Sequence, residues 1–303
     1  MSAIYKGRSW DIDHDRIAQV SNAQLRYAVL GEGEPVLLIH GTNLCDSLVS
    51  GLTFYEPLTK DYRIISYYRA GYNGSTLAKD SLTIEEMADH MKELLDHLGI
   101  EKAHIVGYSF GGVVAFQFLL KYPERAHTAA LLEPYFNRES EDAIKANMDI
   151  GMAAWALFQA GDKRAAVKTF IAGVWGPTME SAVELSCPLD EFDRAERSAD
   201  ITFLVDGPAL WSWGFKMSEA DKYVDQKPKM PFLAVLGTDS ESILPGFLES
   251  QRFMMDWIPQ AERAGIPHAT HGMQSQNPHA VGQAVHEFIR KYPMTGSGGN
   301  VPA

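Results

Sequence analysis

Five mostly apolar runs of strand length alternate with segments of helical periodicity, and this alternation constrains the fold of the 303-residue chain most. The runs occupy residues 35–40, 62–67, 103–106, 129–132 and 231–237. An uninterrupted apolar run suits a strand that is buried on both faces, as in a parallel sheet. Strands that alternate with helices at this spacing indicate right-handed βαβ units. The sequence therefore predicts an α/β protein with a mostly parallel, doubly wound sheet.

The strand pattern is interrupted between residues 137 and 229. Apolar residues repeat there at helical spacing: Ile144, Met148, Met152 and Trp155. We therefore expect a core formed by residues 1–136 and 230–294, with an inserted α-helical cap, or lid, at 137–229. The composition of residues 296–300 is that of a flexible linker, so we expect a disordered tail at 295–303.

The bulk composition excludes several classes of partner. A formal net charge of -12 repels phosphate backbones, so we expect no nucleic-acid partner. No apolar run has the length of about 20 residues that a membrane helix needs, and no signal peptide is recognised, so we expect a cytoplasmic protein without a membrane partner. Cys45 and Cys187 are expected to be unpaired thiols.

The sequence shows no metal-ligand cluster and no nucleotide-binding loop, so we expect no cofactor. We expect the protein to be a monomer or a homodimer.

The strongest chemical signal is Gly-Tyr-Ser-Phe-Gly at residues 107–111. This G-x-S-x-G pattern lies between an expected strand and an expected helix, which is the context of a nucleophile elbow. The sharp turn forces the central serine into a strained backbone conformation and leaves no room for side chains at the flanking positions. Ser109 is thus the candidate nucleophile. The amide of Phe110, at the start of the helix, is a candidate donor to a developing oxyanion.

Several segments together resemble the α/β-hydrolase family, over residues 24–137 and 228–291. They are His40-Gly41, the Gly-rich segment 69–75, the elbow at 107–111 and the C-terminal histidine region. The resemblance implies an α/β-hydrolase fold in which the amide of Thr42 is the second oxyanion donor. It also implies a histidine base in the loop after the last strand, seven residues before a proline that opens the final helix. His271 fits this rule, His268 is the alternative, and His279 is expected inside the helix.

The acid that orients the histidine has two candidates. The commonest family position follows the strand at 232–236 and falls on Ser240, with Asp239 beside it. A second family position lies at the end of the strand after the nucleophile helix, where this chain has Glu133. A carboxylate at a buried strand end is costly unless it has a partner. Some esterases and lactonases of this fold use a Glu there, including fungal lactonases that open zearalenone. We therefore favour Glu133 and keep Asp239 as the alternative.

The cap is rich in tryptophan and methionine, which predicts an apolar roof above the serine. Trp155, Trp211 and Trp213 are the candidate substrate-binding residues. Together these features predict a serine hydrolase of the carboxylesterase or lactonase type, which cleaves a small apolar ester or lactone, aromatic ones included, through an acyl-enzyme. One alternative is a C–C bond hydrolase that attacks a diketone with the same triad. The other is a hydrolase-like ligand receptor with little turnover.

Overall fold

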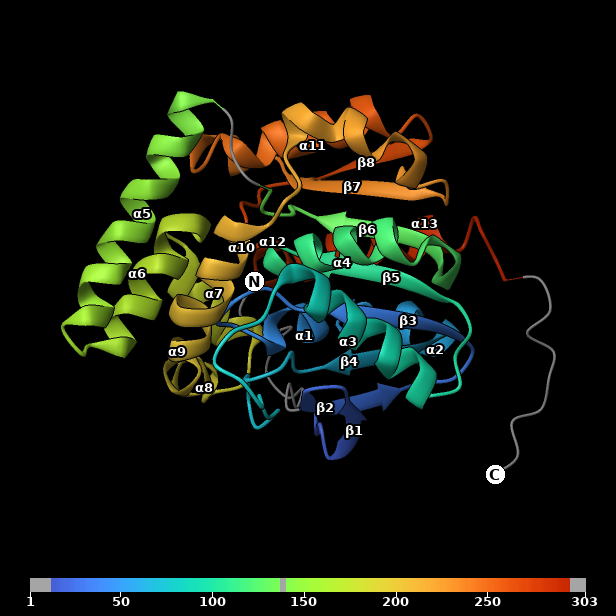
Figure 1. Ribbon diagram of the computed structural model, residues 1–303, viewed down its shortest axis with the longest axis horizontal. Helices are drawn as coiled ribbons and strands as arrows, with labels where there is room; N and C mark the ends of the chain where they lie inside the picture. The colour runs from blue at the N-terminus through green and yellow to red at the C-terminus, as the bar shows by residue number, and fades with distance from the viewer. Residues whose placement is uncertain (1–11, 137–139, 295–303) are drawn as a thin grey trace.

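The computed structural model describes residues 12–136 and 140–294, which form one eight-stranded sheet between helices (Figure 1). The strands are β1 (Arg16–Val20), β2 (Ala23–Leu30), β3 (Glu34–Ile39), β4 (Tyr62–Tyr67), β5 (Ala103–Tyr108), β6 (Ala126–Leu132), β7 (Phe232–Gly237) and β8 (Ala261–Ile266). Their order across the sheet is β1-β2-β4-β3-β5-β6-β7-β8. Strands β3 to β8 run parallel, whereas β1 and β2 form an antiparallel hairpin at one edge. The predicted fold class is confirmed. The predicted disordered tail at 295–303 lies outside the described residues.

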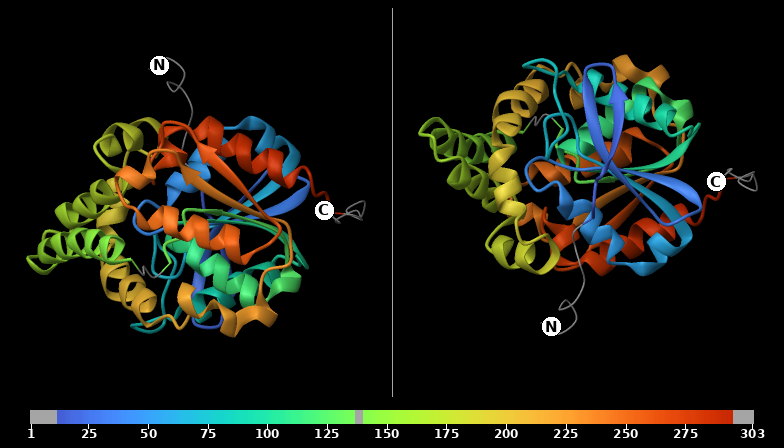
Figure 2. Two further views of the ribbon diagram at one scale, coloured as in Figure 1. Left: turned by 90° about the horizontal axis from the view of Figure 1, so that it is seen from above. Right: turned by 90° about the horizontal axis from the view of Figure 1, so that it is seen from below.

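Helices cover both faces of the sheet, as Figure 2 shows from above and below. They are α1 (Asp46–Thr53), α2 (Glu56–Asp61), α3 (Ile84–His97), α4 (Phe110–Lys121), α11 (Gly246–Trp257), α12 (Met273–Gln276) and α13 (Pro278–Ile289). Alternate residues of a strand face opposite sides of the sheet, so β3 contributes side chains to the hydrophobic cores on both faces. Leu37 and Ile39 pack with α3 and α4, and Val36 and Leu38 pack with α1 and α13. The sheet is therefore buried on both faces, as its continuous apolar strands require.

Between β6 and β7 the described residues form helices joined by short loops, with no strand among them, which confirms a helical insertion. It contains α5 (Glu141–Gln159), α6 (Lys163–Trp175), α7 (Met179–Ser186), α8 (Glu191–Arg197), α9 (Ala199–Ile201), the π-helical η2 (Thr202–Asp206), α10 (Gly207–Ser212) and the 3-10 segment η3 (Met217–Gln226). The insertion projects from one end of the sheet, with α5 and α6 outermost (Figures 1 and 2). None of the helices in the described ranges is long and apolar enough to cross a membrane.

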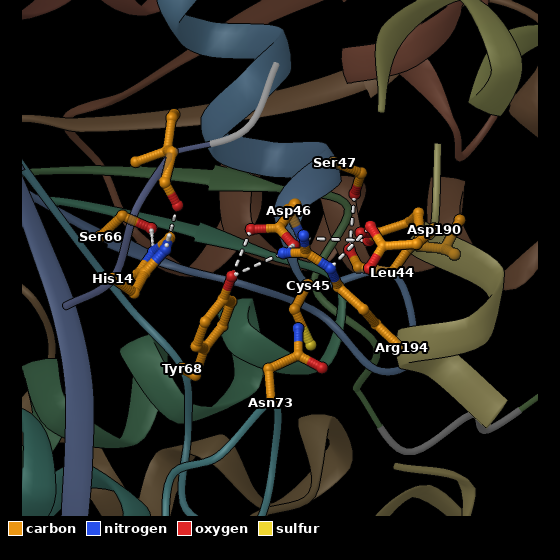
Figure 3. A network of polar contacts seen from close by, with 12 residues as sticks. His14, Leu44, Cys45, Asp46, Ser47, Ser66, Tyr68, Asn73, Asp190 and Arg194 are labelled. Carbon is orange, nitrogen blue, oxygen red and sulfur yellow. Dashed lines mark hydrogen bonds and ion pairs between the residues drawn. The ribbon is translucent and has the colours of Figure 1, made fainter. Parts of the chain in front are cut away.

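Buried polar contacts attach the insertion to the core near the start of α1 (Figure 3). The Asp46 carboxylate accepts hydrogen bonds from the Tyr68 hydroxyl at 2.8 Å and from Arg194 of α8 at 3.2 Å. The Asp46 amide donates to Glu191 Oε1 at 3.1 Å. Glu191 is 1% exposed, and burial together with the nearby Asp46 raises its pKa well above the ordinary value. The two free thiols, Cys45 and Cys187, are also buried.

Candidate active site

Ser109 lies at the sharp turn between β5 and α4, with a strained backbone at φ 54° and ψ -124°. The turn leaves no room for a side chain at the flanking positions, Gly107 and Gly111. A Cβ at Gly107 would lie 2.8 Å from the carbonyl oxygen of Gly111, and a Cβ at Gly111 would lie 2.3 Å from that of Ile39. Only hydrogen fits at these positions, because real Cβ atoms do not approach backbone so closely. The turn predicted from G-x-S-x-G is therefore present, and the cavity described below opens onto Ser109.

His271 lies in the loop after β8, within hydrogen-bond reach of the serine. Its Nε2 is 2.9 Å from Ser109 Oγ, and its Nδ1 is 2.7 Å from Glu133 Oε2. The imidazole stacks on Phe247 with 4.0 Å between ring centroids. The Tyr108 hydroxyl donates to the carbonyl of His271 at 2.8 Å, which ties the His271 loop to β5. These contacts hold the imidazole between one hydroxyl and one carboxylate, the order that a nucleophile, base and acid require.

The other two candidate histidines lie elsewhere. His268 is exposed, and its amide donates to the side chain of Thr238. His279 is exposed on α13, where its ring contacts Tyr55. The structure thus brings His271, and neither of its two alternatives, to the serine.

Glu133 follows β6 in a left-handed backbone conformation, with φ 43°, and is 1% exposed. One oxygen faces His271, and the other accepts hydrogen bonds from the Gly237 amide at 2.7 Å and from the Ser240 hydroxyl. Both oxygens of this buried carboxylate thus have hydrogen-bond partners, which offsets the cost of desolvating it. Asp239 is exposed, and its carboxylate accepts from Thr238.

Ser240 occupies the position where the family most often places the acid, and here its hydroxyl donates to Glu133, the candidate acid. The sequence analysis identified position 240 as the common acid position, but it did not predict that Ser240 would donate a hydrogen bond to Glu133. The adjacency of β6 and β7 brings the two residues together, because their carboxyl ends meet at one edge of the sheet.

The two candidate oxyanion donors border the same cavity as Ser109. A Cβ at Gly41 would lie 3.1 Å from Ser109 Cβ, so the backbone before Thr42 runs close to the serine. Phe110 is the first residue of the 12-residue helix α4, where backbone amides have no partner within the helix. Within the described residues, neither the Thr42 amide nor the Phe110 amide donates to another protein group. Both amides therefore remain candidates for binding an oxyanion at Ser109.

A cavity of about 730 Å³ extends from Ser109 into the helical insertion. Most of its lining is apolar or aromatic, and the insertion contributes residues from α5, α6, η2 and α10: Ile144, Met148, Met152, Trp155, Phe170, Ile171, Val174, Trp175, Phe203, Leu210 and Trp211. The other predicted tryptophan, Trp213, does not line the cavity. It is 4% exposed, stacks on Phe136 and Phe215, and donates from Nε1 to Gln117 Oε1 at 2.8 Å. Trp213 is therefore placed in the core between α4 and the insertion.

Residues of metal-ligating type do not gather elsewhere: no group of three His, Cys, Asp or Glu side chains in the described ranges is arranged to hold a metal ion.

The sheet order, the elbow and the loop histidine together define a protein of the α/β hydrolase class. A family model described as the alpha/beta hydrolase fold matches residues 34–278, which is well over half of the chain. The chain therefore belongs to the α/β hydrolase fold family.

Individual relatives show what this chain is similar to. It is 35% identical over 120 residues to a dihydrolipoyllysine-residue acetyltransferase component of an acetoin cleaving system from Cupriavidus necator, covering 39% of this chain. It is 36% identical over 124 residues to a 2-hydroxy-6-oxononadienedioate/2-hydroxy-6-oxononatrienedioate hydrolase from Comamonas testosteroni, covering 38% of this chain. The chain spans 32% and 41% of the length of these two relatives. A solved esterase from Thermogutta terrifontis superposes with a TM-score of 0.67 at 22% identity, covering 92% of this chain and 100% of that one.

Proposed function

We propose that this protein is a serine hydrolase that cleaves a carboxylic ester or lactone of an apolar substrate. The observation that carries the proposal is the hydrogen-bonded series Ser109, His271 and Glu133, at 2.9 Å and 2.7 Å, at the base of an apolar cavity of about 730 Å³. A nucleophile, base and acid in that order are the parts that acyl transfer needs. The volume lies in the range of about 300–1,000 Å³ that is typical of small-molecule sites.

In the first half of the proposed reaction, His271 Nε2 takes the proton of Ser109 as Oγ attacks the substrate carbonyl. Glu133 holds the Nδ1 proton and stabilises the imidazolium that forms. The amides of Thr42 and Phe110 stabilise the negative charge on the carbonyl oxygen. The C–O bond to the leaving alcohol then breaks, and the alcohol oxygen takes its proton from His271. An acyl-enzyme on Ser109 remains.

In the second half, a water molecule replaces the alcohol. His271 takes a proton from the water as its oxygen attacks the acyl carbon, through the same oxyanion. The bond to Ser109 Oγ breaks, Oγ takes the proton back from His271, and the acid product leaves. No redox step or further reactant is needed.

We propose that the helical insertion is the lid that selects the substrate. Aromatic and methionine side chains of α5, α6 and α10 contribute to the lining of the cavity: Met148, Met152, Trp155, Phe170, Trp175 and Trp211. Burial of apolar surface is worth about 0.8 kcal/mol per methylene, or roughly fourfold in kcat/KM. Longer or aromatic acyl groups should therefore be preferred over acetyl groups until the cavity is filled.

The test is a panel of p-nitrophenyl esters from acetate to laurate, an aryl ester, a lactone and a 2-hydroxy-6-keto dienoate. We expect kcat/KM for the esters to rise with apolar bulk, and Ser109→Ala to abolish turnover. Asp239→Asn is the matched control, since Asp239 is exposed outside the series. Absence of turnover of every ester and lactone would contradict the proposal.

Hydrolysis of a C–C bond is the second candidate. It is favoured by the 36% identity to the hydrolase of Comamonas testosteroni, whose name gives a 2-hydroxy-6-oxo acid as its substrate. Faster turnover of the dienoate than of any ester would favour this candidate. Stoichiometric binding of apolar ligands, with no turnover of the panel, would favour a receptor.

A further inference from the structure

One short segment of the helical insertion contacts two core side chains near Thr42, those of Asn43 and Arg69. This segment is η2, a single π-helical turn, and such turns are frequent at functional sites. The hydroxyl of Thr202, at its start, donates to Asn43 Oδ1 at 2.9 Å. Asp206, at its end, accepts hydrogen bonds from Arg69 Nη1 at 2.9 Å and Nη2 at 2.6 Å.

Arg69 in turn contacts the backbone that precedes Thr42. Its Nη2 donates to the carbonyl of Gly41 at 3.1 Å, and its Nε donates to the carbonyl of His40 at 3.3 Å. The guanidinium also lies over the ring of Phe110, 4.6 Å from the centroid. One side chain of the core thus touches the residues around both candidate oxyanion donors.

The contact with Gly41 has a geometric consequence for Thr42. The carbonyl of Gly41 and the amide of Thr42 belong to one peptide unit, which is planar and trans. The C=O and N–H bonds of such a unit point in opposite directions. Fixing the carbonyl oxygen therefore fixes the direction of the Thr42 N–H. The His40 imidazole shares this carbonyl, with Nδ1 at 2.6 Å.

Arg69 can act in this way only while Asp206 faces it. The guanidinium is 3% exposed and the carboxylate 1% exposed. Burial by itself lowers the pKa of Arg69, but the Asp206 carboxylate outweighs it and raises that pKa, so the cation persists. A buried cation without its partner is strongly disfavoured and moves toward water or other acceptors. Tyr72 donates to Asp206 Oδ2 at 2.7 Å and keeps the carboxylate aimed at Arg69.

We propose that Asp206 and Thr202 are positioning residues for the segment around Thr42, so that the Thr42 amide points at the oxyanion. Asp206 acts through Arg69, and Thr202 acts through the side chain of Asn43. The inference rests on the proposed function. Both residues line the cavity, but their polar atoms already have partners in the protein. Arg69 and Tyr72 bond the oxygens of Asp206, and the Thr202 hydroxyl bonds Asn43 and Tyr72. The insertion would then contribute to the rate of the chemical step as well as to substrate binding.

Asp206→Asn and Thr202→Val test the proposal, because each keeps the size of the side chain. The readout is the rate at which a fluorophosphonate labels Ser109, which does not depend on knowing the substrate. Removal of a whole oxyanion donor costs about 10²–10³ in rate, so a misdirected donor should cost about 10–100-fold for Asp206→Asn and somewhat less for Thr202→Val. The pH midpoint of labelling should not move, because His271 and Glu133 are untouched. On any ester turned over, kcat should fall while KM stays within about threefold.

Arg194→Met is the matched control. It also breaks a contact between the insertion and the core, since Arg194 donates to Asp46 at 3.2 Å (Figure 3). The hydrogen bonds of Arg194 to Asp46, Tyr68 and Asp190 lie outside residues 40–43. We expect Arg194→Met to lower thermal stability, as loss of a structural contact should. The rate at which the fluorophosphonate labels Ser109 in this variant should stay within about threefold of the wild-type rate.

Wild-type labelling rates in Asp206→Asn, or in folded Thr202→Val if Asp206→Asn fails to fold, would overturn the proposal. An equal loss in Arg194→Met would also overturn it, because the effect would then be general loosening. Labelling of wild-type Ser109 without turnover of any ester would count against the proposed function alone, and the labelling rates would still decide this inference. A folded wild type that resists labelling would overturn both.

Discussion

Replacing Glu133 by Gln should remove nearly all activity, and the structure shows why an isosteric change is so costly. Glu133 Oε1 accepts hydrogen bonds from the Gly237 amide and the Ser240 hydroxyl. In the variant, the amide oxygen takes this place, because an NH₂ group cannot accept from two donors. The NH₂ group then faces His271 Nδ1, which must accept. The proton of the neutral imidazole moves to Nε2, and the base that faces Ser109 is lost.

The wrong tautomer costs about 10⁴ in kcat in other triads, which is about 5.4 kcal/mol. Asp239→Asn should stay within about tenfold of wild type, because exposed substitutions away from such features usually cost no more than about 0.5 kcal/mol. The assay is kcat on the best p-nitrophenyl ester, with circular dichroism to show that both variants are folded. A Glu133→Gln enzyme that retains more than a tenth of wild-type kcat would refute the assignment. Equal large losses in both variants would mean that two carboxylates share the imidazole.

Three further perturbations have definite expected outcomes. Trp211→Ala should raise KM for bulky apolar esters more than for acetate esters, because the Trp211 side chain lines the cavity. An equal change in KM for both kinds of ester would mean that Trp211 does not contact the acyl group. Ser240→Ala should lower kcat by up to about tenfold through its lost hydrogen bond to Glu133; unchanged kcat would deny it that role. Glu191 has a raised pKa from burial and Asp46, so its stabilising effect is complete below its ordinary pKa of 4.5 and is lost as the pH rises through the raised value. Glu191→Gln should therefore flatten the decline of the free energy of unfolding as the pH rises above 4.5, by up to about 1.4 kcal/mol per pH unit. Identical slopes in the variant and the wild type would contradict this.

The parts of the fold that could be predicted are those that depend on local pattern. Continuous apolar runs of strand length and apolar residues repeating with a period of 3.6 indicate which residues are buried, so the parallel sheet and the helical insertion could be predicted from the sequence. The elbow is also local, because its glycines and serine are consecutive. His271 could be chosen because its loop keeps a fixed spacing to Pro278 at the start of α13.

The parts that could not be decided depend on distance in space. Glu133 and Asp239 follow neighbouring strands, so the sequence left both within reach of the histidine, and side-chain direction alone distinguishes them. Trp211 and Trp213 stand two residues apart at the end of α10, and only packing determines which one faces the cavity.

The pair formed by Arg69 and Asp206 had no signal at all in the sequence, since 137 residues separate its members. Each residue is ordinary in its local context. Their meeting requires the insertion to fold back over the carboxyl end of β3, and no local pattern encodes that arrangement.

The central claim is that Ser109 is a nucleophile activated by His271, and covalent labelling tests it most directly. The folded wild-type protein is treated with a fluorophosphonate, and the label is located by peptide mass spectrometry. We predict one label per chain, on Ser109, with a rate that falls by orders of magnitude in His271→Ala. A label on another residue, or labelling of Ser109 at the same rate without His271, would contradict the account.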